Sequence, residues 1–142
     1  MPQNIKRLLG ARIIFIFAVA YTLLITTLSL VRLGKISVGS FNPTDKMMHT
    51  AAYFGLAFCW LFYIFIKMPD SYNFRRGFVK VSAVVVLFGM LIEVLQGAIT
   101  TYREPNWADI VANTIGVLIA LGFFILFRNF LNNVKRQISS FL

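Results

Sequence analysis

Four long apolar stretches, separated by short polar segments, form the main pattern of hydrophobic and polar positions along the chain. Each is close to the roughly 20 residues that a helix needs to cross the hydrocarbon core of a bilayer. The pattern predicts membrane-spanning helices over residues 13–31, 45–66, 78–99 and 108–127. We therefore expect an all-α membrane protein, a four-transmembrane-helix bundle that forms one domain over residues 1–142.

Two further segments bear on this arrangement. The first apolar stretch follows Lys6 and Arg7, as in a secretory signal, but it is too long for one and no small-residue cleavage site follows, so we expect it to be retained. The tail over residues 129–142 is amphipathic, with apolar residues at helical spacing and with Lys135 and Arg136 on another face. It is expected either to lie along an anionic membrane surface or to continue the fourth helix into water.

The composition excludes the common soluble classes. Hydrophobic residues make up 58% of the chain and charged residues 13%, and the mean hydropathy is +0.76. A soluble domain carries roughly 25% charged residues, and a disordered chain has far fewer apolar ones. The single cysteine, Cys59, lies in an apolar run and excludes a disulfide framework and a multi-cysteine zinc site. The net charge of +9 alone would suggest nucleic acid, but too few polar side chains remain to form a nucleic-acid-binding face.

The basic residues predict the orientation of the bundle, because lysine and arginine are enriched in the cytoplasmic loops of membrane proteins. Ten of the 14 lie before the first span, between the second and third, or after the fourth, and these three segments share one side of the membrane. Four of the five acids lie toward the other side. We therefore expect both termini to be cytoplasmic and the acids to lie on the outer side.

Polar residues gather on this outer side at the start of the second span. Asp45 and His49 are four residues apart and share a helix face, which Tyr53 continues one turn deeper. Lys46 lies beside them, and the negative Asp45 suits the first turn of a helix. This opening is a candidate for chemistry rather than for packing alone.

The third and fourth spans bring further polar residues to the same side. Glu93 and Gln96 lie one turn apart near the outer end of the third span, and Arg103 lies in the linker that follows. Asp109 and Asn113 lie one turn apart at the start of the fourth. A carboxylate within a span costs about 2.5–3.5 kcal/mol on insertion scales, so Glu93 is expected to face the bundle and to carry function.

Structural explanations stay open for part of this set. Residues 42–49 and 106–113 share the pattern Asn-x-x-Asp with a polar residue four positions later. Asn-x-x-Asp matches the spacing of a helix-capping box, which needs no further function. Asn113 fits a role in joining helices, and Gly116 fits a close-packing position. The repeated pattern also suggests that the bundle consists of two similar helical hairpins.

As an ordered set, these residues resemble the VanZ-like family of small bacterial membrane proteins. The resemblance covers roughly residues 43–125 and rests on the following motifs: Asp45-Lys46-Met47-Met48-His49 with Tyr53; Glu93 with Gln96; Arg103; and Asp109 with Asn113 and Gly116. One departure is the loop before Arg103, which is Thr100-Thr101-Tyr102 where relatives often have a Gly/Pro turn. The resemblance implies a helical bundle in the bacterial inner membrane. The family takes its name from resistance to the glycopeptide teicoplanin and supplies no settled activity.

The first predicted function is an outer-leaflet site that binds or modifies a lipid-linked or cell-envelope molecule and affects glycopeptide susceptibility. His49 or Glu93 would act as general acid or base, and Asp45 would orient His49. Arg103 and Lys46 would hold an anionic headgroup. The predicted catalytic set is Asp45, His49, Glu93, Arg103 and Asp109, and the predicted substrate-binding set is Lys46, Tyr53, Gln96 and Asn113.

The alternative is a non-catalytic protein whose polar cluster binds an envelope component or locks the bundle. Transport ranks below both, since four short spans form a pore only in an oligomer, and the oligomeric state stays open. No cofactor or metal is predicted, although His49 and the acids Asp45, Glu93 and Asp109 form a mixed nitrogen and oxygen set without a recognised ligand spacing. The expected partners are membrane lipids and a lipid-linked substrate or glycopeptide, and not nucleic acid.

Overall fold

The protein is all-helical over the residues that its structure, a computed structural model, describes, which are 3–31, 44–67, 74–99 and 106–141. The helices are α1 (Gln3–Leu30), α2 (Asp45–Lys67), α3 (Phe74–Ile99), α4 (Trp107–Leu126) and α5 (Arg128–Phe141). The first four are long and apolar enough to cross a membrane, which confirms the predicted four-helix membrane bundle. α1 begins well before the predicted span at residue 13, because a helix can continue beyond the apolar residues that face the bilayer.

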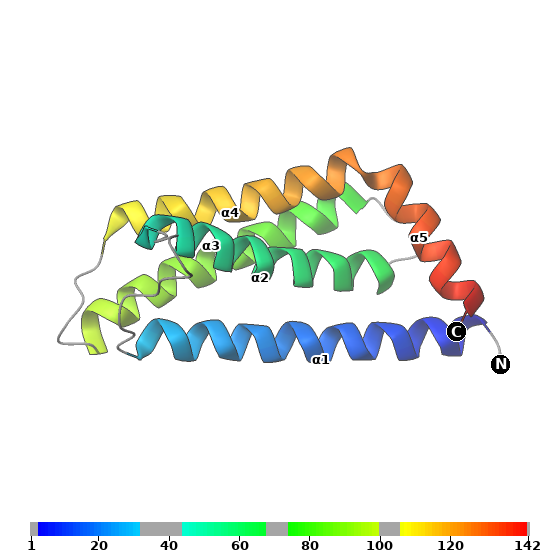
Figure 1. Ribbon diagram of the computed structural model, residues 1–142, viewed down its shortest axis with the longest axis horizontal. Helices are drawn as coiled ribbons and strands as arrows, with labels where there is room; N and C mark the ends of the chain where they lie inside the picture. The colour runs from blue at the N-terminus through cyan, green and yellow to red at the C-terminus, as the bar shows by residue number, and fades with distance from the viewer. Residues whose placement is uncertain (1–2, 32–43, 68–73, 100–105, 142) are drawn as a thin grey trace, which may run out of the picture.

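α2 lies at the centre of the bundle and contacts α1, α3 and α4. Successive spanning helices run in opposite directions, so α2 and α4 are parallel and begin at the same end of the bundle (Figure 1). We call this the acidic end, because Asp45 and Asp109 lie in the first turns of these two helices. α3 finishes there and carries Glu93 within two turns of its last residue.

The backbones of α2 and α4 approach each other closely at Gly116. A Cβ atom at Gly116 would lie 2.3 Å from the backbone oxygen of Thr50 and 2.8 Å from the backbone nitrogen of Phe54. The Thr50 hydroxyl also donates a hydrogen bond to the backbone oxygen of Ala112, at 3.1 Å. Small residues allow such close approach of membrane helices, so the predicted packing role of Gly116 is confirmed.

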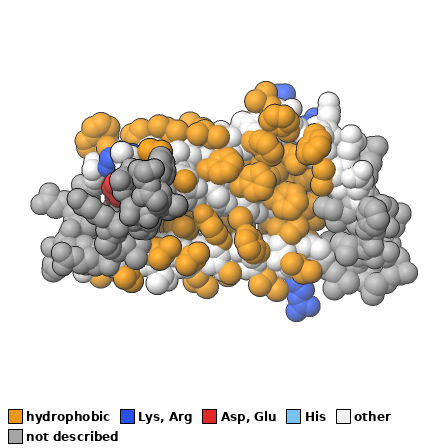
Figure 2. Space-filling model, in the orientation of Figure 1, with side chains coloured by type: hydrophobic (Ala, Val, Ile, Leu, Met, Phe, Trp, Pro, Cys, Tyr) orange, Lys and Arg blue, Asp and Glu red, His pale blue; other side chains and the backbone are white. Residues whose placement is uncertain are grey.

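Beyond Gly116, farther from the acidic end, the α2–α4 interface is aromatic and apolar. Phe124 of α4 is fully buried, with ring centroids of Phe58 and Phe78 at 5.1 Å and 5.4 Å. The outer surface is apolar as well: Ile13, Val84 and many other large hydrophobic side chains are mostly exposed. Figure 2 shows hydrophobic side chains over most of the middle of the molecule. Exposed apolar area of this extent fits contact with lipid rather than with water.

α5 is a separate helix rather than a straight continuation of α4. It turns away after Phe127 and crosses toward the start of α1 (Figure 1), where it contacts that helix. Leu131 faces inward and is 5% exposed. The start of α1 and the end of α5 therefore lie at the same end of the bundle, opposite to the acidic end. The side of the membrane that this end faces, and the similarity of the two hairpins, stay predictions.

Candidate functional site

The first two turns of α2 supply the candidate side chains Asp45, Lys46 and His49. The Thr44 hydroxyl accepts a hydrogen bond from the backbone nitrogen of Met47, at 3.3 Å, and so caps the helix. Asn42, which the sequence pattern suggested as a cap, lies outside the described residues. With the helix fixed in this way, Asp45 and His49 share a face, and their side chains come within 3.9 Å.

The first turn of α4 faces the first turn of α2. Asn106 is the N-cap, and its side chain accepts a hydrogen bond from the backbone nitrogen of Ala108 at 3.0 Å, as the capping interpretation predicts. The Asp109 side chain accepts a hydrogen bond from the Lys46 ammonium group of α2. Asp109 is therefore part of the contact between the two helices as well as of the first turn of α4.

His49 is 9% exposed and is oriented by Asn113 of α4. The His49 Nδ1 and the Asn113 Oδ1 are 3.0 Å apart. Because an amide oxygen can only accept, Nδ1 carries the proton, and in the neutral imidazole Nε2 keeps its lone pair. The predicted role of Asn113 in joining helices is thus combined with a second role, since it fixes which nitrogen of His49 is free to react.

Three carboxylates surround this imidazole. Glu93 Oε1 lies 3.8 Å from Nδ1, while Asp45 Oδ1 and Asp109 Oδ2 each lie 3.9 Å from Nε2. Glu93 and Asp109 are 2% and 6% exposed, whereas the Asp45 side chain is largely exposed. The positive ends of the α2 and α4 dipoles meet at this point and favour the negative charge.

The remaining predicted residues lie deeper or outside the described part of the chain. Tyr53 is one turn below His49 and is 1% exposed, with its ring against Gly89 of α3. Gln96 is also buried, and its amide donates to the backbone oxygen of Ser29 at 2.7 Å, which ties α3 to α1. Arg103 lies outside the described residues.

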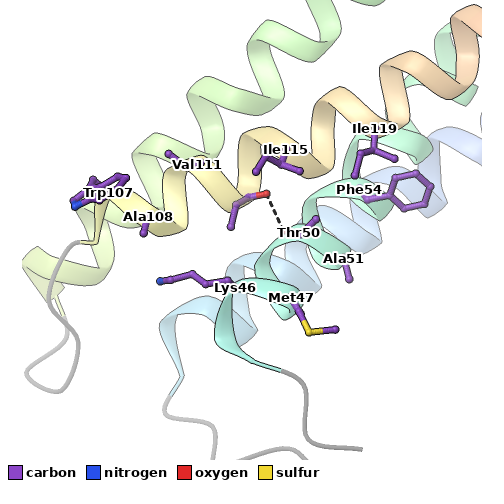
Figure 3. Close-up of a pocket in the computed structure, with 11 residues that line it drawn as sticks. Lys46, Met47, Thr50, Ala51, Phe54, Trp107, Ala108, Val111, Ile115 and Ile119 are labelled. Carbon is purple, nitrogen blue, oxygen red and sulfur yellow. Dashed lines mark hydrogen bonds between the residues drawn. The ribbon is translucent and has the colours of Figure 1, made fainter.

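An apolar groove of about 720 Å³ runs along the outside of the α2–α4 interface, and the sequence pattern did not reveal it. Figure 3 shows Lys46 and Trp107 at one end of the groove and Phe54 and Ile119 at the other. Its walls are residues at helical spacing on each helix, but only the pairing of α2 with α4 places the two faces together. The lining residues are Lys46, Met47, Thr50, Ala51, Phe54, Trp107, Ala108, Val111, Ala112, Ile115 and Ile119.

Lys46 joins the groove to the polar cluster. Its side chain lines the acidic end of the groove, and its ammonium group binds Asp109 beside His49. A half-exposed cation therefore stands where an apolar, membrane-facing surface meets a buried imidazole and its carboxylates. Chemically, this arrangement offers an acid or base with a fixed tautomer, and a place for an apolar chain next to it.

The chain matches no protein-family profile, no curated protein and no solved structure. The resemblance to the VanZ-like family therefore stays a prediction that rests on the motifs.

Proposed function

We propose that the protein is a VanZ-like component of the bacterial inner membrane that binds, and acts on, a lipid-linked molecule of the cell envelope at the outer leaflet. The observation that supports this proposal is the junction at Lys46, where the α2–α4 groove meets the polar cluster around His49. An amphiphile needs both parts, an apolar channel for its chain and polar groups for its head.

The chain of the ligand occupies the groove. The groove lies on two membrane-spanning helices, so a lipid chain can enter it from the bilayer without crossing water. Apart from Lys46 and Thr50, its lining is apolar. The headgroup then lies at the acidic end, within reach of the half-exposed Lys46.

The polar cluster acts on the headgroup. His49 serves as general base or acid through Nε2, because Asn113 holds the proton of the ring on Nδ1. Asn113 orients the imidazole through Nδ1, and Glu93 lies on the same side of the ring. Asp45 and Asp109 face Nε2 at 3.9 Å, and Lys46 with Arg103 holds an anionic group. A change in an envelope lipid or its headgroup would alter the response of the cell to teicoplanin.

A groove-filling variant tests the binding part of the proposal. Ala51 is an exposed residue of the groove, and Ala51→Phe fills it without touching the polar cluster. Labelling of the purified protein by a photoreactive polyprenyl phosphate is expected to fall at least about tenfold, which corresponds to roughly 1.4 kcal/mol. Ala98→Phe, on an exposed face of α3 outside the groove, is the matched control and should label like the wild type. Equal labelling of both variants contradicts the proposal.

Variants of the polar cluster test whether it acts chemically. Glu93→Gln and His49→Ala are expected to abolish the teicoplanin phenotype while the thermal unfolding midpoint stays near that of the wild type. Ser82→Ala removes a buried polar group from the same helix as Glu93, far from the cluster, and should leave the phenotype intact. Turnover of a labelled lipid-linked substrate that Glu93→Gln abolishes is the result that would establish an enzyme.

The alternative is that the polar cluster only locks the bundle. The contacts Lys46–Asp109 and His49–Asn113 favour it, because each joins α2 to α4. Under this alternative both variants unfold the protein, and the phenotype is lost only together with the fold.

The assignment to the outer leaflet rests on the charge pattern and has its own test. Reporter fusions after Lys35 and after Lys67 should report the outer side and the cytoplasm, respectively. A cytoplasmic signal after Lys35 would overturn the orientation, and with it the outer-leaflet site.

A further inference from the structure

Three electron-rich atoms converge at the acidic end. Asp45, His49 and Asp109 each bring one ligand atom to within 4.8 Å of the others. His49 Nε2 lies 3.9 Å from both Asp45 Oδ1 and Asp109 Oδ2. With the ring proton on Nδ1, Nε2 keeps a lone pair, and the two carboxylate oxygens that face it at 3.9 Å cannot donate to it. The Lys46 ammonium group binds the other oxygen of Asp109, Oδ1, and lies 3.9 Å from Asp45 Oδ2. A lone pair that faces two carboxylate oxygens offers nitrogen and oxygen ligands to a cation between them.

The distances leave room for an ion between Nε2 and the two carboxylates. If His49 were protonated at Nε2, a hydrogen bond to either carboxylate would bring nitrogen and oxygen to about 2.7–3.2 Å. Both separations are 3.9 Å, which is too long for such a bond. Ligand atoms about 2.1 Å from a tetrahedral zinc ion lie roughly 3.4 Å apart. The two 3.9 Å separations are about 0.5 Å longer than this, a difference that a rotation of the exposed Asp45 side chain and a small shift of Asp109 would close when an ion binds.

The surroundings of His49 match those of a metal ligand. Metal-binding histidines donate their other ring N–H group to a carbonyl or carboxylate, which fixes the ring and its tautomer. Asn113 Oδ1 accepts this bond, and Glu93 lies on the same side of the ring, 3.8 Å from Nδ1. Glu93 is therefore placed behind the ligand and not among the ligands.

We propose that Asp45, His49 and Asp109 bind a divalent metal ion, zinc in preference to magnesium, with further coordination positions open. One imidazole with two carboxylates suits zinc, whereas magnesium demands oxygen ligands in near-ideal octahedral geometry. Three protein ligands with an open position are typical of zinc sites that bind a water or a substrate. The exposed Asp45 gives the ion access from water. This site goes beyond the proposed function, since binding of a metal does not depend on which molecule the protein acts on. A bound metal would occupy Nε2, so in the metal-bound protein a water on the metal, and not Nε2, would be the acid or base.

Metal content and affinity of the purified protein test the site directly. The full chain is purified in detergent without a polyhistidine tag, analysed for metals, stripped with a chelator and titrated with Zn²⁺ and separately with Mg²⁺. The wild type is expected to bind one zinc ion per chain and to unfold at a higher temperature with zinc. Asp45→Asn and His49→Ala should lower zinc affinity by more than the about 10–100-fold loss expected of Asn113→Ala, which removes only the support of the ring.

Glu93→Gln is the matched control, because it removes a carboxylate from the same cluster on the Nδ1 side of the ring. It should retain zinc binding within about tenfold, the lower bound for loss of a supporting group. Three results would each overturn the site: no zinc binding by the wild type, binding that Asp45→Asn leaves unchanged, or an equal loss in Glu93→Gln and Asp45→Asn. Asp45 is exposed, so Asp45→Asn tests the site even if His49→Ala does not fold.

The experiments test the metal site and the lipid-binding groove independently of each other. If zinc binds but Ala51→Phe labels normally, the site stands and the groove proposal is wrong. If labelling falls as expected but no zinc binds, the groove proposal stands and the metal site is wrong.

Discussion

α2 is held by α4 on one side and by α1 on another, and the two interfaces are built differently. Against α4, backbone approaches backbone, with Gly116 over Thr50 and Phe54. Against α1, contact is made through long side chains: the Tyr21 hydroxyl donates to the backbone oxygen of Ala52, and the Trp60 indole donates to the Thr22 hydroxyl. The first interface leaves little room for adjustment, whereas the second can adapt by rotation of side chains.

This difference explains where the candidate site lies. His49 and Asn113 come from different helices, and a hydrogen bond of 3.0 Å between them requires a fixed separation of those helices. The close contact at Gly116, about one helical turn after Asn113, fixes this separation. α1 contributes no side chain to the cluster among the described residues, and only 11% of its apolar window is buried, against 39% for α4. A lipid-facing helix that can shift would position catalytic groups poorly.

The largest effect is expected at the rigid interface. Gly116→Ala places a methyl group against backbone atoms that cannot rotate away, so α2 and α4 must separate. We expect a loss of about 2–3 kcal/mol, at the upper end of the usual cost of overpacking, and weaker zinc binding as the cluster opens. Gly122→Ala, in the same helix with nothing within 4 Å of the added atom, should be neutral or stabilising. Thermal unfolding in detergent compares the two, and equal midpoints would contradict the backbone contact.

The coupling energy of the Lys46–Asp109 ion pair, which joins α2 to α4, should exceed that of the Lys46–Asp45 pair within α2. A double-mutant cycle with Lys46→Met and Asp109→Asn is expected to give about 1 kcal/mol, reduced by the exposure of Lys46. The matched cycle with Lys46→Met and Asp45→Asn covers a 3.9 Å pair with the exposed Asp45 and should give near zero. Equal coupling energies in the two cycles would mean that Asp109 is not held by Lys46.

The α1–α2 interface, which can adapt by rotation of side chains, should tolerate a glycine-to-alanine substitution better than the α2–α4 interface does. A Cβ atom at Gly55 would lie 2.6 Å from the Tyr21 hydroxyl oxygen, the far end of a flexible side chain. Gly55→Ala is therefore expected to cost under about 1 kcal/mol, close to the value of one interhelical hydrogen bond. In the Tyr21→Phe background the same substitution should cost less, because the hydroxyl is gone. A cost as large as that of Gly116→Ala would remove the distinction between the two interfaces.

The smallest effect is expected for the hydroxyl that receives the Trp60 indole. Thr22→Val removes the acceptor of a 3.1 Å bond and should cost about 0.6 kcal/mol, the average for such bonds in membrane helices. Thr27→Val is the control, since its exposed hydroxyl bonds only within α1, to the backbone oxygen of Leu23. A stability change that is equal for the two variants would show that the bond from Trp60 to Thr22 adds nothing to the α1–α2 interface.

Much of the fold was predictable because the bilayer leaves few choices. A run of about 20 apolar residues in lipid must satisfy its backbone internally and becomes a helix. The predicted spans at 45–66 and 108–127 accordingly lie within a residue of α2 and α4. The direction of the C-terminal tail was less predictable from the sequence, because residues 129–142 suit both a straight continuation of α4 and a bend away from it. The contact of α5 with α1 decides for the bend.

The candidate site was predictable as a group of residues but not as a geometry. The spacing of Asp45 and His49, and of Asp109 and Asn113, places each pair on one helix face. No periodicity gives the distance between the two faces, so the bond from Nδ1 to Asn113 and the position of Glu93 on that same side came only from the packed helices. Gln96 illustrates the limit, since its partner is the backbone of Ser29 in α1.

The sequence by itself determined that this chain forms four membrane helices and that Asp45, Glu93, Asp109 and His49 gather at one end, because hydropathy and helical spacing are local properties. The tertiary structure alone decided that α2 and α4 meet at Gly116. That contact creates the groove, brings Lys46 to Asp109, and turns the lone pair of His49 toward two carboxylates. Such features depend on the distance between the helices. The size of the side chains at one contact sets that distance, and no local sequence pattern encodes it.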